Sequence, residues 1–140
     1  MARYAVEPAV AVKWFIPEVL SREAARLLTG AHDLIGTDLL FPHAGEIVSV
    51  KAGMGQLDAD EARQILSALL SVPVLLYPSG HLMESAMEIS LSGRWSFIDG
   101  LNLALAVQNQ CRLVTARRGL YDSVQQSPFA SHVKWVGDMK

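Results

Sequence analysis

The stretch from Trp95 to Thr115, WSFIDGLNLALAVQNQCRLVT, constrains the fold more than any other part of the chain. It predicts a helix that opens at Asp99, is apolar on nearly every face, and passes at Asn109-Gln110 into a short strand over 112–115. A helix of this kind is buried. A carboxylate at the start of a buried helix is costly unless something satisfies it. Asp99 is therefore either an N-cap, accepting from the free amides of the first turn, or part of a site.

The rest of the chain alternates short apolar strands with helices, which predicts a parallel sheet covered by helices on both faces. Helix N-caps are expected at Ser21, at Asp58, where Glu61 completes the spacing of a capping box, and at Ser79. Strands are expected over 4–6, 34–35, 74–77, 112–115 and 133–136, and helices over 10–15, 21–30, 38–54, 58–72, 81–93, 99–108 and 118–126.

Length and composition narrow the class of protein. The 140 residues contain no repeat and no linker, which favours a single domain over 1–140. The lone Cys111 cannot form an intramolecular disulfide, and no signal peptide or stretch of membrane-spanning length is evident, so we expect a cytoplasmic protein without a membrane partner. The apolar content of 51% suggests a buried oligomer face, and hence a homodimer.

The net charge of −2 gives no overall sign of a nucleic-acid-binding surface, although Arg112, Arg117 and Arg118 are close in sequence. Excess apolar surface, including some of Trp14, Phe15, Ile16 and the helix over 58–72, could serve a homodimer face or a groove for an antitoxin helix.

Polar residues are expected to converge at the carboxyl edge of the sheet, where helix N-termini gather and where open α/β folds bind ligands. Glu7 and Arg117 each follow a strand, and His43, Glu46 and Asp99 lie at or near helix N-termini. Carboxylates from separate segments hold Mg²⁺ or Mn²⁺ for phosphodiester hydrolysis. Glu7 and Asp99 supply two such groups, and Glu46, three residues after His43 on the same helical face, adds a third.

Four stretches, in order, resemble the PIN domains of VapC-type toxins, which are small endoribonucleases of toxin–antitoxin pairs. They are YAVEPAVAVKWF, TDLLFPHAGEIVSVKAGMGQL, SFIDGLNLALA and LVTARRGLY, and together they span nearly the whole chain. The resemblance implies a PIN-like three-layer α/β/α sandwich with a central parallel sheet. It also implies a dimer, an antitoxin partner, and acidic residues that bind Mg²⁺ or Mn²⁺ for cleavage of RNA.

The sequence departs from the family pattern where the chemistry is expected. The first acidic position, normally Asp, is Glu7; the second, normally Glu, is His43; and the third is kept as Asp99. The fourth, normally the Asp of a Thr-x-Asp motif, is Arg117, which follows Thr115 by two residues. The acidic site is therefore degenerate, and we expect Mg²⁺ or Mn²⁺ binding to be weak or absent, since a guanidinium repels a cation.

Two functions remain open. The first is an endoribonuclease in which Glu7 and Asp99, with Glu46 or His43, hold one cation while Thr115 orients substrate or a ligand water; His43 would favour Mn²⁺ or a softer metal. The second is a non-catalytic module that binds RNA or an antitoxin. In that reading Arg117 pairs with the carboxylates in place of a metal, and Arg112 and Arg118 help to bind RNA.

A phospho-acceptor receiver domain also alternates strand and helix. It is disfavoured because no acidic pair follows the first strand and no Lys follows the last.

Overall fold

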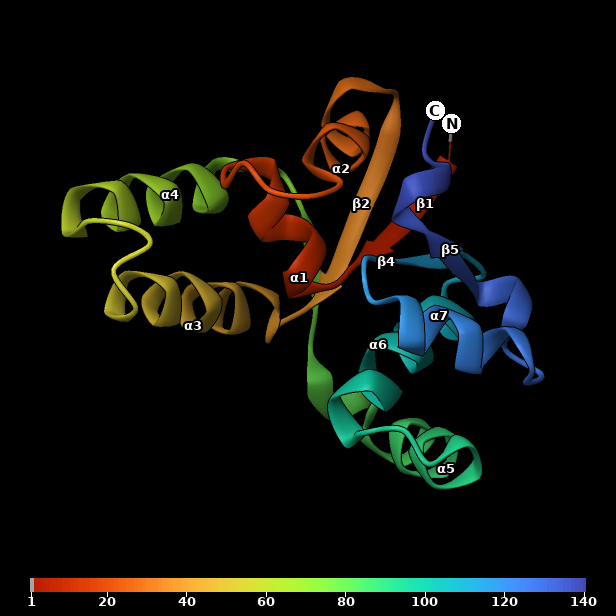
Figure 1. Cartoon of the computed structure of the whole chain (residues 1–140). Helices are drawn as coiled ribbons and strands as arrows, with labels where there is room; N and C mark the ends of the chain where they lie inside the picture. Colours follow the sequence, from red (N-terminus) through yellow and green to blue (C-terminus); the bar gives the residue numbers. More distant parts are fainter. Residues whose placement is uncertain (1) are drawn as a thin grey trace.

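The computed structural model describes residues 2–140 and is organised around one five-stranded sheet (Figure 1). The strands are all parallel and lie in the order β3-β2-β1-β4-β5. This confirms the predicted PIN-like α/β/α fold with a central parallel sheet. The strand bounds are β1 (Ala2–Val6), β2 (His32–Thr37), β3 (Leu75–Tyr77), β4 (Arg112–Thr115) and β5 (Val133–Trp135).

Helices cover both faces of the sheet. On one side of the sheet, α1 and α2 contact the strands, α3 packs on α1 and α4 packs on α3; on the other side, α6 and α7 contact the strands and α5 packs on α6 (Figure 1). The α-helices are α1 (Pro8–Ala11), α2 (Ser21–Thr29), α3 (Leu40–Gly53), α4 (Ala59–Ser71), α5 (Met83–Gly93), α6 (Phe97–Gln108) and α7 (Arg118–Gln125). Short 3₁₀ turns span Val12–Trp14, Ser79–His81, Ala130–His132 and Val136–Asp138.

Successive side chains of each strand point to opposite faces of the sheet, so the sheet contributes to two hydrophobic cores. On β1, Ala5 packs in the core of α5, α6 and α7, while the next residue, Val6, packs in the core of α1 to α4. Leu113 and Val114 on β4 divide in the same way. A strand that is buried on both faces has to be apolar throughout, which is why these strands read as short continuous apolar runs in the sequence.

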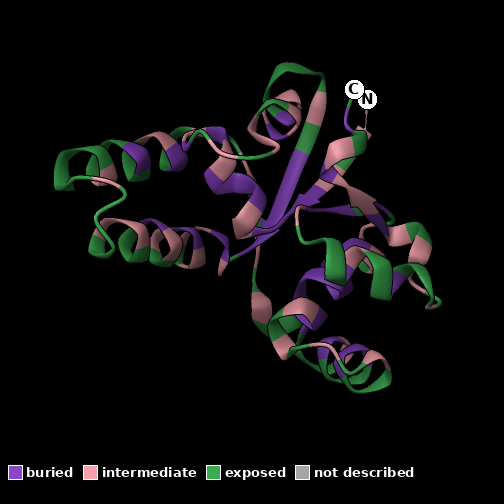
Figure 2. Cartoon of the chain, viewed as in Figure 1, coloured by how far each residue is buried: buried purple, intermediate pink, exposed green. Residues whose placement is uncertain are grey.

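The α3–α4 pair extends away from the sheet, with its outer faces exposed (Figures 1 and 2). This arrangement corrects part of the predicted interface. Trp14 and Ile16 are buried in the core, and the Trp14 indole donates to the carbonyl of Ala24, so neither side chain is available to a partner. On α4, by contrast, Leu66 and Leu70 are exposed. Among residues 2–140, no helix combines the length and apolar character needed to cross a membrane.

The serine caps predicted from local sequence are wrong in two places. Leu20, with φ of 70°, precedes α2, and Ser21 is the first helical residue, its hydroxyl accepting from the amide of Glu18. Ser79 donates its hydroxyl to Asp38, which lowers the pKa of that carboxyl, and α5 begins only at Met83. The capping box of Asp58 with Glu61 is confirmed, since both of its hydrogen bonds form.

The start of α6 is also corrected, and this correction bears on the site. Ser96 is the N-cap, its hydroxyl accepting from the amide of Asp99 at 3.0 Å. The helix therefore begins at Phe97, and Asp99 lies in its first turn. Because Ser96 caps the helix, the carboxylate of Asp99 is not the cap and is available to other partners.

We predict that Ser96→Ala lowers the free energy of unfolding by about 1 kcal/mol, because an amide of the first turn loses its acceptor. Ser92→Ala on α5 is the matched control, since its exposed hydroxyl only donates back to the carbonyl of Ile89. Urea denaturation of the two variants measures the difference. Equal stability of both would show that Ser96 is not the cap.

Candidate functional site

A pocket of about 360 Å³ lies at the carboxyl edge of the sheet, where the ends of β1 and β4 meet α1, α3 and α6. It brings together all five of the residues that the sequence placed at this edge. Polar and charged side chains share its wall with apolar ones. The lining residues are Glu7, Pro8, Ala9, His43, Glu46, Ile47, Ser96, Ile98, Asp99, Asn102 and Arg117.

Glu7 is buried between β1 and α1, with only 1% of its surface exposed. It follows the last residue of β1 directly, and Pro8 then starts α1, which keeps the backbone of Glu7 extended. Its Oε1 accepts from the hydroxyl of Thr115 at 2.8 Å and from the amide of Ala116 at 3.3 Å. The buried carboxylate is thus tied to the end of β4.

Arg117 bridges the two carboxylates of the site. Its Nη2 lies 2.8 Å from Glu7 Oε2 and 2.5 Å from Asp99 Oδ1, and its Nε and Nη1 make longer bonds of 3.4 Å to the same two groups. The amide of Arg117 also donates to the hydroxyl of Thr115. Thr115 therefore contacts both ends of the Glu7–Arg117 pair and orients it.

The charges of the site explain why the guanidinium stays ionised. Burial lowers the pKa of Arg117, but the hydrogen bonds and negative charges of Glu7 and Asp99 outweigh that effect and raise the pKa above its ordinary value. The three groups together carry a net charge of −1. With Glu46 the pocket wall carries −2 when His43 is neutral, so the pocket remains acidic.

His43 and Glu46 lie on α3, one turn apart, and both line the pocket as predicted. Within residues 2–140, neither side chain makes a hydrogen bond or ion pair. Glu46 is exposed and His43 is half-buried. Glu46 thus supplies a free carboxylate across the pocket from the Glu7–Arg117–Asp99 bridge.

The three arginines that are close in sequence, Arg112, Arg117 and Arg118, do not form one cluster. Arg112 opens β4 and is paired in register with Tyr4, so it lies toward the amino end of the strands, about 10 Å of strand away from Thr115. Arg118 is the first residue of α7 and lies outside the pocket. The prediction that Arg112 and Arg118 bind RNA remains a prediction.

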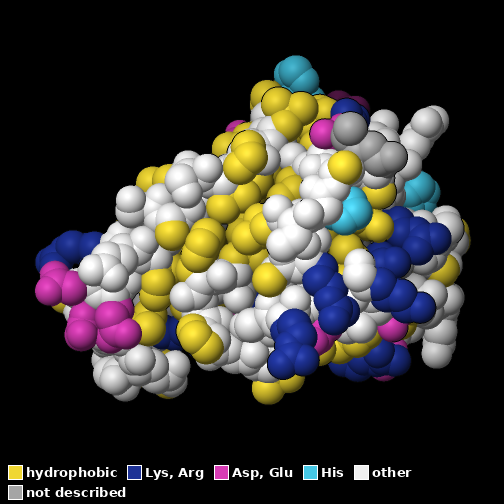
Figure 3. All heavy atoms as spheres, turned by 90° about the horizontal axis from the view of Figure 1, so that it is seen from above, with side chains coloured by type: hydrophobic (Ala, Val, Ile, Leu, Met, Phe, Trp, Pro, Cys, Tyr) yellow, Lys and Arg dark blue, Asp and Glu magenta, His cyan; other side chains and the backbone are white. Residues whose placement is uncertain are grey.

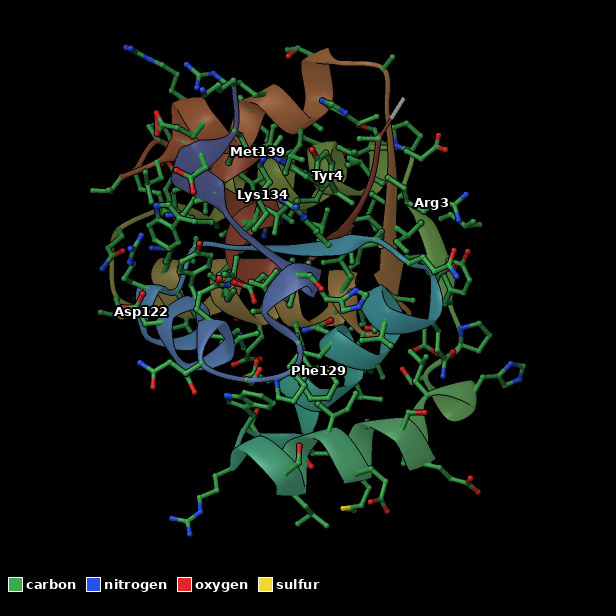
Figure 4. The ribbon with its side chains drawn as sticks, turned by 90° about the vertical axis from the view of Figure 1, so that its right-hand side faces the viewer. Arg3, Tyr4, Asp122, Phe129, Lys134 and Met139 are labelled. Atoms are coloured by element: carbon green, nitrogen blue, oxygen red, sulfur yellow. The ribbon has the colours of Figure 1, made fainter. Side chains whose placement is uncertain are left out.

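Arg118 is held on the surface by aromatic and acidic neighbours. Its guanidinium carbon lies 5.1 Å from the ring centre of Tyr121 and 5.0 Å from that of Trp135, and its Nε lies 3.2 Å from Asp122. Asp122 projects from α7 at the edge of the molecule, whereas Lys134 lies on the face of the sheet toward α2 (Figure 4). Basic side chains gather on this side of the molecule (Figure 3).

Sequence reasoning missed two polar residues of the pocket, Ser96 and Asn102. Asn102 is only 5% exposed and stands one turn after Asp99, as the single polar side chain in the run from Leu101 to Val107. That isolation was a usable signal, because a buried amide in an otherwise apolar helix needs a partner. Ser96 precedes Asp99 by three residues, which is the spacing of a capping contact.

The arrangement does not fit a divalent cation. Among residues 2–140, no group of three or more His, Cys, Asp or Glu side chains is placed to hold a metal ion. The carboxylates of Glu7 and Asp99 both accept from Arg117. A hard cation such as Mg²⁺ needs about six oxygen ligands, and here the guanidinium takes the carboxylate oxygens that would supply them.

Comparison with solved structures places the fold. The chain has a VapC-like fold. It superposes on VapC20 of Mycobacterium tuberculosis, a toxin that cleaves the sarcin–ricin loop. The TM-score is 0.61 and the sequence identity is 15%, and the match covers 76% of this chain and 83% of the toxin. It also matches PAE2754 of Pyrobaculum aerophilum, with a TM-score of 0.63 and 20% identity over 97% of this chain and 85% of that protein.

A third similar structure is a toxin–antitoxin complex from Klebsiella pneumoniae, with a TM-score of 0.60 and 12% identity over 96% of each chain. No protein-family model and no curated protein matches the sequence. At these identities the likeness shows the fold, and the chemistry has to be argued from the pocket itself.

We predict that Arg117→Met lowers the free energy of unfolding by about 1.5 to 3 kcal/mol, because Glu7 then loses a charged donor inside the fold. We expect a loss of free energy in the lower part of this range, because the Arg117 side chain is 45% exposed and solvent screens its charge. In a double-mutant cycle with Glu7→Gln, measured by urea denaturation at pH 7, we expect a coupling energy of about 1 kcal/mol.

The control cycle uses Arg63→Met and Asp60→Asn, an ion pair of 3.1 Å whose side chains are 76% and 86% exposed. Solvent screening should leave that pair without measurable coupling. A coupling between Glu7 and Arg117 as small as that of the control pair would contradict the bridge.

Proposed function

We propose that this chain is a PIN-domain protein of the VapC type that binds RNA without metal-dependent cleavage, Arg117 having taken the place of the catalytic cation. The observation that carries the proposal is the double bridge of Arg117 to Glu7 and Asp99, at 2.8 and 2.5 Å. The guanidinium neutralises one unit of negative charge and satisfies both carboxylates. It thus fulfils the electrostatic role of a metal without offering a site that activates water.

The magnitude of the charge effect supports loss of cleavage rather than a modest weakening. Two unit charges of the same sign about 4.5 Å apart repel by about 4 kcal/mol in a partly shielded protein edge, and a divalent ion feels twice that. A metal at this site would also have to displace Arg117 from Glu7, which is buried. Either cost is large compared with the binding energy of a weakly held Mg²⁺ or Mn²⁺.

The charge distribution along the chain supports RNA as the ligand. The last thirty residues contain five basic residues against two acidic ones, in a chain whose net charge is −2. The basic residues are Arg112, Arg117, Arg118, Lys134 and Lys140. Basic side chains gather on the side of the molecule where α7 and the C-terminal segment lie (Figures 1 and 3). Phosphates are bound by such a surface in a salt-dependent manner.

The test compares Mn²⁺ binding by calorimetry and RNA cleavage for the wild type, Asp99→Ala and Arg117→Asp. We expect the wild type to bind Mn²⁺ no better than Asp99→Ala and to leave RNA intact, while Arg117→Asp gains Mn²⁺ binding because the repelling charge becomes a ligand. The matched control is Arg118→Asp, which makes the same change of charge one residue along, outside the pocket. It should not gain Mn²⁺ binding.

Single-stranded RNA should bind the wild type in the presence of a chelator, with an affinity that falls as salt rises. If instead the wild type binds Mn²⁺ and cleaves RNA, and Asp99→Ala abolishes both, the chain is a metal-dependent nuclease and Arg117 is not a substitute for the cation. If the wild type binds no RNA at low salt, RNA is not its ligand.

A second candidate function, recognition of an antitoxin-like partner, is favoured by the exposed apolar side chains of the α3–α4 pair. Val50, Met54, Leu66 and Leu70 are 48%, 66%, 40% and 60% exposed. Leu66 also lines a groove between α3 and α4 whose other lining residues are mainly small, which lets another helix approach closely. The occupant we propose is an amphipathic helix of a partner protein. A homodimer remains a further prediction.

We predict that a labelled amphipathic helical peptide with Leu at i, i+3 and i+7 binds the wild type. Leu66→Glu combined with Leu70→Glu should weaken that binding at least tenfold, as measured by fluorescence anisotropy. The control is Leu91→Glu on α5, a residue that is 68% exposed but lies on another helix. An equal loss from the control would show that the groove has no selectivity.

A further inference from the structure

The pocket contains a buried polar side chain that the Glu7–Arg117–Asp99 bridge does not use. Asn102 is only 5% exposed and lines the pocket, and its side-chain amide makes no hydrogen bond with any of residues 2–140. The polar atoms of Asn102 are not among the fully buried atoms that lack a partner, so the amide is accessible from the pocket. The amide therefore offers its NH2 group as a donor and its oxygen as an acceptor to a ligand in the pocket.

The other groups around the pocket narrow the class of ligand. Glu46 offers a free carboxylate from α3, while Pro8, Ile47 and Ile98 contribute apolar surface. A ligand that fits this wall is partly apolar and carries hydrogen-bond donors. A volume of about 360 Å³ lies at the lower end of the range for small-molecule sites, roughly 300 to 1,000 Å³.

The charge of the pocket excludes a phosphate from its interior. Glu7, Glu46 and Asp99 outnumber Arg117, so the wall keeps a net charge of −2 when His43 is neutral. A phosphate would be repelled by this negative charge. If RNA binds at this pocket, its phosphate backbone must stay outside the pocket, and only a neutral base can enter it. Outside the pocket, the exposed side chain of Arg118, the residue after Arg117, can contact the phosphates.

Among the four RNA bases, guanine matches the free groups best. Its Watson–Crick edge carries two adjacent donors, N1–H and N2–H₂, which one carboxylate accepts as a pair. Adenine and cytosine each place a ring acceptor beside the amino group, and uracil places a carbonyl on each side of its single N–H. A carboxylate repels these acceptors. The guanine O6 and N7 remain as acceptors for an amide such as that of Asn102.

We propose that this pocket binds an unpaired guanine base, with Glu46 accepting from its Watson–Crick edge and Asn102 hydrogen-bonding to it. This inference rests on the proposed function, because it assumes that the chain is a PIN domain that binds RNA without a metal. It adds that the RNA is selected by a guanine base. An unpaired base turned out of the strand reaches such a pocket at a modest unstacking cost. Recognition of single-stranded RNA commonly uses this kind of contact.

The test titrates the full chain with guanosine, inosine and uridine, in a chelator, by calorimetry. Guanosine should bind, and inosine, which lacks only the N2 amino group, should bind about tenfold more weakly. Uridine should give no measurable heat. Glu46→Gln, an exposed substitution that leaves the fold intact, should weaken guanosine binding at least tenfold, and Asn102→Leu should do the same. Glu84→Gln on α5 is the matched control and should leave the affinity unchanged.

Three results would overturn the inference. The first is no guanosine binding by the wild type, and the second is equal binding of guanosine and uridine. The third is tighter binding of N-acetylargininamide than of guanosine, which would assign the acidic pocket to a cationic side chain of a partner protein. Because guanosine carries no phosphate, its failure to bind while single-stranded RNA still binds would reject the guanine pocket alone. Failure of RNA itself would reject the proposed function.

Discussion

The contact of Arg117 with Glu7 and Asp99 is the interaction on which the site depends. It ties the end of β1 to the first turn of α6 and the turn after β4, although Glu7 is 110 residues from Arg117 in the chain. Glu7 is buried just after the central strand of the sheet and is tolerable there only because it is paired and hydrogen-bonded. Thr115 completes the arrangement by contacting both members of the buried pair.

The chemistry of the pocket follows from the kind of charge that occupies it. A guanidinium brings one positive charge and a planar set of donors, and it is covalently attached, so it cannot leave or be exchanged. A divalent cation brings twice the charge and carries water that can attack a phosphodiester. With Arg117 in place the carboxylates are satisfied, but the wall stays acidic and Asn102 and Glu46 remain free. Such a pocket is suited to selecting a neutral, donor-rich ligand.

The sequence predicted secondary structure correctly where the deciding hydrogen bonds join residues that are close together in the chain. The capping box of Asp58 and Glu61 needs only residues three apart, and it forms as expected. The five strands were found because burial on both faces leaves a recognisable apolar run. The role of each serine was less predictable, because a hydroxyl group can donate or accept a hydrogen bond with whichever partner is near. Ser79 donates to Asp38, forty-one residues away, and Ser96 is the N-cap of α6, where a cap at Asp99 was one of two alternatives.

The sequence by itself determined the class of fold and the edge at which the polar residues meet, because parallel strands linked by crossover helices have one carboxyl edge. It also predicted that a positive charge replaces an acidic one at Arg117. Only the tertiary structure decided which groups pair, that Arg112 lies apart from them, and that Asn102 faces the pocket without a partner. The physical reason is that these contacts depend on how α6 and β4 pack against the rest of the chain. Side chains that are far apart in the sequence and meet only in the folded protein leave no local sequence pattern.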